Sequence, residues 1–293
     1  MKSTNYALLA LAALIAACST AKTDDSEEKM DKMTSSVPTL TMAWETDTTL
    51  ITPESVIYDA NNDVYYVSCI GAVPPGAQDG DGYIAKVAPG GEILANPWVS
   101  GLDGPKGMAI SDGKLYVADI DKLVTIDIAT GEIISKTLVI GATFLNDADA
   151  DADGTIYLTD TENATLFMAK GDDVTEVLKN DELAGLNGVY LDGDRKVLAA
   201  YGAGKVYTLE GETLTAVADS IAGGDGVEKY KDGFFVSSWN GQVYYLASDW
   251  TKTKVLDTKA ENVNAADIDV IESQNLLVVP TFFANKIVAY TIK

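Results

Sequence analysis

Six times along the chain a polar residue precedes a short apolar strand, a turn of Asp, Gly or Asn, and a second strand rich in Val, Tyr and Leu. The six phrases are PESVIYDANNDVYYVS, PKGMAISDGKLYVAD, LNDADADADGTIYLTD, LNGVYLDGDRKVLAA, GDGVEKYKDGFFVSS and ADIDVIESQNLLVVP. Turn residues at intervals of about ten predict four short strands in each repeat. In the third repeat these strands are expected at residues 146–150, 155–159, 165–170 and 174–178. Repeats of about forty residues with four strands are typical of β-propeller blades, so we predict an all-β, six-bladed propeller over residues 39–293.

The two ends of the repeat region complement each other. Each of the first five repeats ends in a fourth strand, whereas the sixth stops after its third, NKIVAYTI. The segment TLTMAWE, residues 39–45, stands before the first repeat and supplies the missing strand. We predict that it pairs with the last blade and removes an exposed sheet edge. Trp44 and Trp98 lie in predicted outer strands, where we expect them to pack between blades.

The N-terminus carries a different pattern. Residues 1–17 hold one Lys and an apolar run that ends in small residues directly before Cys18, which predicts an export signal too short to span a bilayer. The ending LIAAC resembles a bacterial lipobox, which implies that Cys18 is lipidated and that Ser19 directs sorting to the outer membrane. Residues 18–38 are polar and charged, which predicts a disordered tether facing the periplasm. The expected membrane contact is through the lipid only.

The amino-acid composition argues against several classes of function. The chain has 21 Lys and Arg against 44 Asp and Glu, no His, and a formal net charge of −23. Coulomb repulsion therefore argues against a nucleic-acid partner. Without His there is no Ser-His-Asp triad, and neither GxGxxG nor GxxxxGK[ST] is present. With Cys18 lipidated, Cys69 is left without a disulfide partner, and we interpret it as a packed small hydrophobe.

One column of the repeats carries the candidate site. In a propeller the first strand of each blade lines the central channel, so the residues at its start converge around the axis. These residues lie 52, 40, 41, 38 and 42 positions apart and are Glu54, Lys106, Asn146, Asn187, Asp225 and Asp267. Five of the six carry side-chain oxygens, the ligands that Ca²⁺ takes in groups of roughly six to eight. Ca²⁺ is the expected ion, with Mg²⁺ and Mn²⁺ as alternatives, and hydrogen bonding to blade backbones is the competing interpretation.

A second acidic motif has a simpler interpretation. Asp149, Asp151, Asp153 and Gly154, with Asp160 at the twelfth position, match the D-x-D-x-D-G pattern of a calcium-binding loop. The other repeats place NND, SDG, DGD and KDG at the corresponding point. We therefore predict an ordinary turn between the first and second strands, without the helices of an EF-hand.

The phrases PESVIYD, LNDADADADG, LNGVYLD and GDGVEKYKDGFFVSSWNGQVYYL resemble the Glu, Asn-Asp, Asn-Gly and Asp-Gly motifs of the gluconolactonase and regucalcin (senescence marker protein) family, which is related to paraoxonases and diisopropyl fluorophosphatase. The resemblance covers residues 40–293. It implies a monomeric, calcium-dependent hydrolase of a lactone or ester. It also implies Glu54, Asn187 and Asp225 as metal ligands, Asn146 as a further ligand or substrate contact, and Asp225 as base or nucleophile. Asp267 and Lys106 would lie beside the ligands.

Three features qualify this expectation. Lys106 places an ammonium group in the ring, where we expect it to pair with Glu54 or Asp267. Sugar lactonases of the family often carry Arg two residues before the Asn-Asp motif, and Phe144 at that position favours a more apolar ester or lactone. The insertion CIGAVPPGAQDGDG, residues 69–82, lies on the same face as the ring and is either a lid or a plain surface loop. The alternative function is a non-catalytic propeller resembling NHL-repeat domains that binds a peptide, glycan or envelope protein.

Overall fold

The computed structural model describes residues 37–293. The predicted signal segment, Cys18 and the tether up to residue 36 lie outside this range. Between residues 37 and 293, no helix has the length and apolar character needed to cross a membrane.

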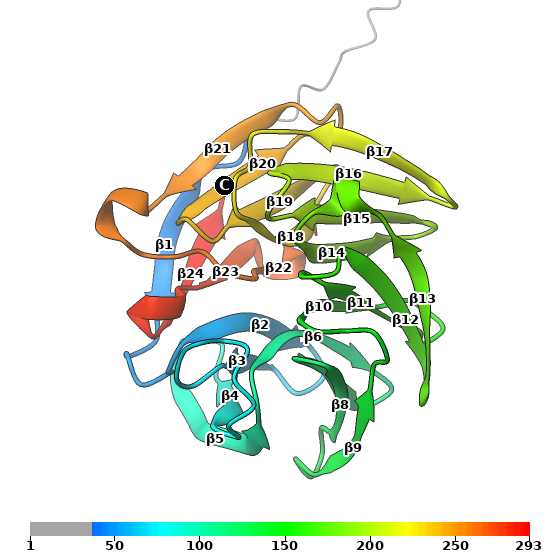
Figure 1. Ribbon diagram of the computed structural model, residues 1–293. Coiled ribbons are helices and arrows are strands. Elements are labelled where there is room, and N and C mark those ends of the chain that lie inside the picture. The colour runs from blue at the N-terminus through cyan, green and yellow to red at the C-terminus, as the bar shows by residue number, and fades with distance from the viewer. Residues whose placement is uncertain (1–36) are drawn as a thin grey trace, which may run out of the picture. The chain divides into compact units, whose positions relative to one another are not determined.

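Six antiparallel four-stranded sheets surround a central channel, which confirms the six-bladed propeller (Figure 1). The first three blades are β2 (Pro53–Asp59), β3 (Val64–Cys69), β4 (Gly82–Val87) and β5 (Ile93–Leu102); β6 (Pro105–Ser111), β7 (Lys114–Asp119), β8 (Lys122–Asp127) and β9 (Ile133–Leu138); and β10 (Leu145–Ala150), β11 (Ile156–Asp160), β12 (Thr165–Lys170) and β13 (Asp173–Lys179). The fourth and fifth are β14 (Leu186–Asp192), β15 (Arg195–Ala200), β16 (Lys205–Glu210) and β17 (Thr213–Ala218); and β18 (Gly224–Tyr230), β19 (Gly233–Ser238), β20 (Gln242–Leu246) and β21 (Lys252–Asp257). The first strands β2, β6, β10, β14 and β18 lie nearest the centre of Figure 1.

The sixth blade is built from both ends of the described chain. It contains β22 (Asp269–Ile271), β23 (Leu276–Pro280), β24 (Ile287–Ile292) and, as its outer strand, β1 (Leu40–Glu45). β1 runs antiparallel to β24, with Leu40 opposite Ile292, and the Lys286 Nζ to Glu45 Oε2 distance is 2.6 Å. The predicted closure by the N-terminal strand is therefore confirmed.

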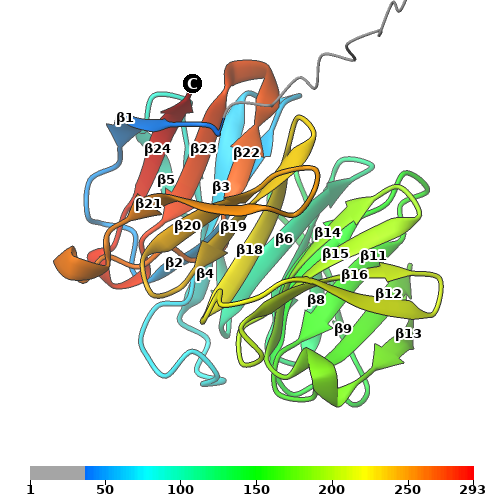
Figure 2. The ribbon, with the colours of Figure 1, turned by 90° about the horizontal axis from the view of Figure 1, so that it is seen from above.

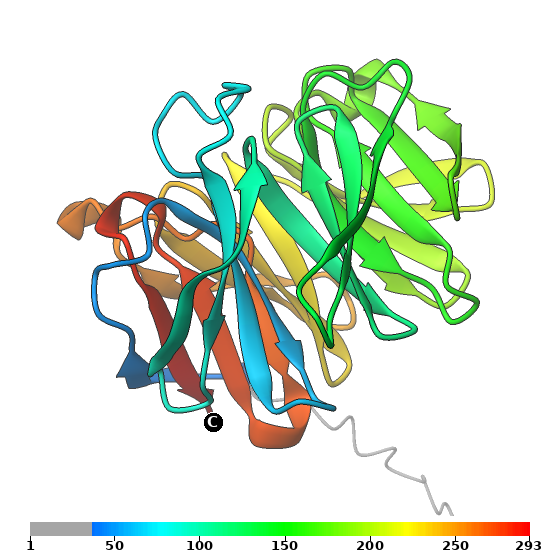
Figure 3. The same ribbon diagram turned by 90° about the horizontal axis from the view of Figure 1, so that it is seen from below.

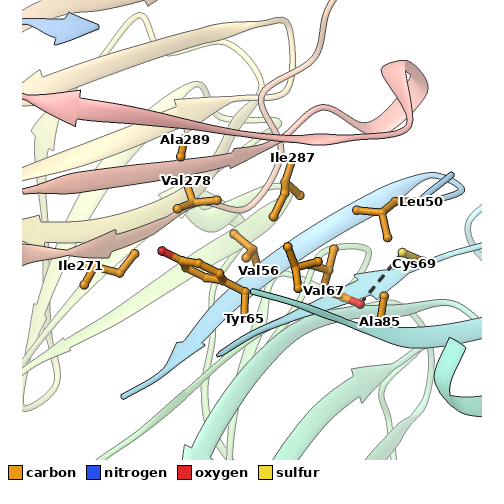
Figure 4. Packing of buried hydrophobic residues seen from close by; sticks show 11 residues of the cluster. Leu50, Val56, Tyr65, Val67, Cys69, Ala85, Ile271, Val278, Ile287 and Ala289 are labelled. Atoms are coloured by element: carbon orange, nitrogen blue, oxygen red, sulfur yellow. Dashed lines mark hydrogen bonds between the residues drawn. The ribbon is translucent and has the colours of Figure 1, made fainter. Parts of the chain in front are cut away.

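The core lies between adjacent blades rather than in one central cluster. Figure 4 shows the seam between blades 6 and 1, where Val56, Tyr65 and Val67 pack against Val278, Ile287 and Ala289. Trp44 of β1 contacts Tyr65 of β3, with ring centroids 5.5 Å apart, so it packs between blades as predicted. Trp98 of β5 stacks on Tyr66 and also lies close to Gly131 of the next blade. Cys69 is buried, and burial raises the pKa of its thiol to about 12, consistent with a packing role.

The acidic segment of blade 3 forms the predicted turn. β10 ends at Ala150 and β11 begins at Ile156. Between them, Asp151 accepts a hydrogen bond from the Asp153 backbone N–H at 3.0 Å, as an Asx turn requires. Asp160, at the other end of β11, is buried and accepts from the backbone N–H of Thr143 and Phe144. The segment is flanked by strands β10 and β11 rather than by helices, so the motif is not an EF-hand.

Carboxylates join two of the seams along the channel. From β10, Asp147 and Asp149 accept backbone hydrogen bonds from Val189 and Leu191 of the next blade, each at 2.7 Å. At the seam between blades 6 and 1, Asp267 accepts from the Ser55 hydroxyl at 2.6 Å, and Asp269 accepts from the Tyr58 N–H at 2.7 Å. These buried acidic groups have partners within the protein, and they fix the register between neighbouring blades.

Candidate functional site

A cavity of about 650 Å³ opens at the mouth of the channel. Five of the six ring residues predicted from the repeats line it, namely Glu54, Lys106, Asn146, Asn187 and Asp225. Each comes from the beginning of the first strand of a different blade, from β2, β6, β10, β14 and β18 in turn. The propeller thereby brings together side chains that span 171 residues of sequence, from position 54 to position 225.

Four oxygens of this ring have no hydrogen-bond partner in the protein although they are buried. They are Oε2 of Glu54, Oδ1 of Asn146, Oδ1 of Asn187 and Oδ1 of Asp225. All four are acceptors, and they come from four blades around one cavity. A buried acceptor without a partner is costly, so such a group calls for a ligand, a water or an ion.

The orientation of Asn146 is fixed by its neighbours. Its Nδ2 donates to the Thr161 hydroxyl at 3.0 Å, and that hydroxyl donates in turn to the Leu186 carbonyl at 2.8 Å. The amide therefore directs its NH₂ group away and leaves its Oδ1 as the unpartnered acceptor.

Steric crowding explains why glycine follows Asn187 and Asp225 in the Asn-Gly and Asp-Gly phrases. A Cβ on Gly188 would stand 2.2 Å from the Asp225 carbonyl oxygen, and one on Gly226 would stand 2.3 Å from Oδ1 of Asp267. Only glycine lets the first strands of adjacent blades approach this closely. The close approach brings Asn187 and Asp225 side by side at the channel mouth.

Without a bound cation, the surroundings of the ring disfavour the charged forms of both Glu54 and Asp225. Burial raises the pKa of Glu54 well above its usual range, and Asp225 and Asp267 raise it further. Burial likewise raises the pKa of Asp225, with added contributions from Asp267 and Asp147. A positive ion among these carboxyl groups would lower both pKa values again.

Lys106 does not form the ion pair expected from the sequence. Among residues 37–293, its Nζ lies within ion-pair distance of neither Glu54 nor Asp267; it donates instead to the carbonyls of Gly104 at 2.7 Å and Pro75 at 3.2 Å. The Nζ also lies 4.3 Å from the centroid of the Phe144 ring. Burial lowers the pKa of Lys106 to about 8, against the opposing influence of Glu54 and Asp119. The ammonium group is held between the Gly104 carbonyl, directly before β6, and the Pro75 carbonyl of the inserted loop, because these two oxygens accept from its donors.

Asp267 does not line the cavity, in contrast to the other ring residues. Its backbone N–H donates to the Glu54 carbonyl at 3.0 Å, while its carboxylate accepts from Ser55. Burial raises the pKa of Asp267 to about 7. Asp267 therefore lies beside the ring, against the backbone of Glu54, and five of the six blades contribute a ring residue to the cavity.

The walls of the cavity were largely missed by the sequence reasoning. They are formed by residues that follow the second strands, namely Ile70, Thr161, Tyr201, Trp239, Phe282 and Phe283. Ile70, Thr161, Tyr201 and Trp239 each stand immediately after the second strand of a blade, so they form a second repeat column. Thr161, Tyr201 and Trp239 lie one position beyond the end of their phrases, and Ile70 lies two positions beyond its phrase.

The inserted loop of blade 1 contributes to the same cavity. The loop, residues 70–81, projects from the propeller between β3 and β4 (Figures 2 and 3). Its Val73, Pro74 and Pro75 line the cavity beside Phe144. Asp81 closes the neck of the loop by accepting from the Ala72 N–H at 2.9 Å. The loop is therefore not a plain surface loop, because three of its residues form part of the cavity wall.

The donor set fits a hard cation. Two carboxylates and two amide carbonyls supply four oxygens, and water or substrate oxygens would complete the six to eight that calcium takes. Among the described residues no group of three or more His, Cys, Asp or Glu side chains is placed to hold a metal ion, and this ring combines two carboxylates with two Asn amides. The set is thus suited to oxygen-preferring ions rather than to Zn²⁺ or Cu²⁺.

Fold and ring together place the chain among the six-bladed β-propellers with an oxygen-lined channel mouth. Two solved structures show the same fold. A catalytically inactive His-to-Ala variant of virginiamycin B lyase from Staphylococcus aureus, with quinupristin, is 14% identical with a TM-score of 0.62, covering 87% of this chain and 99% of that chain. A streptogramin B lyase is 12% identical with a TM-score of 0.61, covering 88% of this chain and 98% of that one. No protein-family model and no curated protein matches the sequence.

Proposed function

We propose that this protein is a metal-dependent hydrolase of the gluconolactonase type, with Ca²⁺ as the preferred ion and a lactone or ester as substrate. The observation that carries the proposal is the set of four buried, unpartnered oxygens, from Glu54, Asn146, Asn187 and Asp225, around one cavity. A set of acceptors without donors is complementary to a cation, whereas hydrogen bonding to blade backbones would have left each oxygen with a partner.

These four residues would hold the ion at the floor of the cavity. When bound, it supplies Lewis-acid polarisation of the substrate carbonyl. Asp225 then has one of two roles. As a base it takes a proton from water while the water oxygen bonds to the carbonyl carbon; as a nucleophile its carboxylate bonds to that carbon directly. In either case the carbon–oxygen bond of the lactone or ester breaks, and water supplies the hydrogen and hydroxyl of the product.

Elimination chemistry of the kind suggested by the two lyase structures has less support. The variant of virginiamycin B lyase that is described as catalytically inactive has a histidine replaced by alanine. This chain contains no histidine, so a mechanism that depends on one is not available to it. A non-catalytic propeller that binds a peptide or glycan is the competing function, and it requires no tightly bound cation.

Calorimetry with calcium and an assay panel of lactones and aryl esters separate the two functions. We expect EDTA-stripped protein to take up one calcium ion and to regain hydrolysis when calcium is added. Asn187→Ala should lose both properties. The matched control is Asn240→Ala, which removes the same amide from an exposed turn. Absence of calcium uptake by the stripped wild-type protein would exclude the hydrolase.

We further propose that the domain is anchored to the bacterial outer membrane through a lipid on Cys18. The support is the signal-like segment of residues 1–17 and its ending before that cysteine. In a bacterial host, the full chain should partition into the detergent phase of a Triton X-114 extract, and Cys18→Ser should move it to the aqueous phase. Equal partitioning of the two proteins would refute the anchor.

A further inference from the structure

The cavity has an apolar side that the proposed chemistry does not use. On one flank Trp239 lies edge to face with Phe282 and Phe283, at centroid distances of 5.6 and 5.9 Å, and the two Phe rings lie 4.8 Å apart at 89°. This aromatic corner comes from the loops that follow β19 and β23, including η4 (Phe282–Ala284). Trp239 and Phe282 belong to a small cluster with Ile70 and Ala266. The packing holds the rings in place before any ligand arrives.

A second apolar surface lines the same cavity. It consists of Val73, Pro74 and Pro75 of the inserted loop together with Phe144. Gly104 permits this approach, because a Cβ there would stand 2.5 Å from the Pro75 carbonyl oxygen, and Gly76 of the loop faces the Phe144 ring across an ordinary packing distance. Lys106 fastens the loop through the Pro75 carbonyl. The loop surface is therefore seated against blades 2 and 3.

Few polar groups of the cavity wall remain for a polyhydroxylated ligand. They are the Tyr201 hydroxyl and the indole N–H of Trp239. The Thr161 hydroxyl is engaged by Asn146 and Leu186, and Lys106 donates to two backbone carbonyls. The four unpartnered oxygens are acceptors assigned to the ion. Most hydroxyl groups of a sugar lactone would thus face apolar parts of Trp, Phe, Val and Pro side chains, where their hydrogen bonds to water would not be replaced.

We infer that the aromatic corner and the loop surface form a binding site for the apolar substituent of the substrate, so that the site takes alkyl- or aryl-substituted lactones and esters in preference to sugar lactones. The carbonyl group lies over the oxygen floor, and the substituent extends between the two apolar surfaces toward the cavity mouth, where Phe283 is 56% exposed. The volume of about 650 Å³ is in the range of cavities that enclose small organic ligands. The inference rests on the proposed function for the position of the carbonyl.

The test compares γ-undecalactone with δ-gluconolactone. We expect wild-type protein to have the larger kcat/KM for the alkyl lactone. Phe283→Ser should lower that preference by about tenfold, and mainly by raising KM, because the Phe283 ring contacts only the apolar part of the substrate. The control is Leu138→Ser, an equally exposed apolar residue at the end of the outer strand β9. A preference for δ-gluconolactone, or a Phe283→Ser variant with the wild-type ratio, would overturn the inference.

Binding measured without turnover keeps the two proposals distinct. In calcium-free protein, γ-undecalactone should quench tryptophan fluorescence in the wild type, and Phe283→Ser should weaken the affinity. If the alkyl lactone binds in this way but calcium and hydrolysis are absent, the hydrolase proposal fails and the apolar site stands. If calcium binds and δ-gluconolactone is the better substrate, the hydrolase stands and the apolar site is refuted.

Discussion

The channel contains two layers of polar side chains that differ in whether the protein satisfies them. Asp147, Asp149 and Asp269 accept hydrogen bonds from the backbone of the next blade. At the channel mouth, Asn187 and Asp225 carry buried oxygens that accept none. Both layers consist of Asp and Asn-type residues on first strands, so residue type alone does not distinguish them. The difference teaches that the partnered carboxylates hold the blades together, whereas the unpartnered oxygens are available to a ligand.

The largest expected effect comes from the mouth of the channel. Asp225→Asn should lower kcat/KM by about 10²–10⁴-fold, because the amide has neither the basicity nor the nucleophilicity of the carboxylate. The calcium-free variant should unfold at a temperature no lower than the wild type, since a carboxyl group repelled by Asp267 and Asp147 has been neutralised. Hydrolysis assays and thermal unfolding in EDTA check the two parts. If Asp225→Asn destabilised the protein as much as Asp147→Ala, the two groups of polar residues would not differ in the way proposed.

The role of Asp225 is sharpened by a single turnover in ¹⁸O-labelled water. If peptide mass spectrometry finds the label in the Asp225 carboxylate, Asp225 is the nucleophile, because water has then attacked the aspartyl carbon of the mixed anhydride that Asp225 forms with the substrate. If Asp225 is the base, the label appears in the product alone. Calcium-free protein, which should not turn over, provides the unlabelled control.

For the partnered carboxylates at the blade seams we expect the opposite, namely a loss of stability with little change in calcium binding. Asp147→Ala removes the acceptor for the Val189 N–H and leaves that buried donor without a partner, which should cost about 1–3 kcal/mol of unfolding free energy. Residual calcium affinity per folded molecule should change less than in Asn187→Ala. Urea unfolding of Asp147→Ala beside the exposed control Glu212→Ala measures the difference. An undiminished free energy of unfolding would show that the seam bond is dispensable.

The stability of the calcium-free protein and its affinity for calcium should both depend on pH. Burial raises the pKa of Asp149 and Asp269 to about 6 and that of Asp267 to about 7, whereas unfolded carboxyl groups titrate near 4. The folded state therefore binds more protons between about pH 4 and 7, so its stability should fall as pH rises through this window. Thermal unfolding in EDTA from pH 4 to 8 checks the slope, and Asp269→Asn should reduce it. Calcium affinity should change in the reverse direction, strengthening as protons leave Glu54 and Asp225.

The smallest effect is expected at Lys106. Lys106→Met should strengthen calcium binding by less than about tenfold, because the ammonium repels the ion over a distance but is directed toward carbonyl oxygens. It should also speed hydrogen exchange in residues 72–81, since Nζ no longer holds Pro75. Calorimetry and exchange mass spectrometry measure the two changes. A large gain in affinity with no change in the loop would instead make Lys106 a counter-ion of the site.

The sequence was sufficient for the blades, the closing strand and the ring because each depends on a repeated pattern of short strands and turns. It failed where a residue leaves the pattern. Spacing alone would place Asp267 in the ring, and only the family resemblance placed it beside the ligands; its carboxylate bonds to Ser55, which lies 212 residues away. The sequence predicted a carboxylate partner for Lys106, but its Nζ donates to backbone carbonyls, one of them in the inserted loop. A pattern of side chains does not reveal where a backbone carbonyl points. The aromatic corner was overlooked because Trp239 and Phe283 lie just outside the repeated phrases.

The shared sixth blade has a consequence for the order of events during synthesis. Among the described strands, β1 leaves the ribosome first and β24, to which it bonds, leaves last. Until β24 has emerged, one edge of the growing protein has no neighbour, and the five finished blades cannot form a ring. The ring therefore closes only after the other strands have been made. The channel mouth, whose residues come from blades 1 to 5, acquires its final shape when β1 and β24 meet.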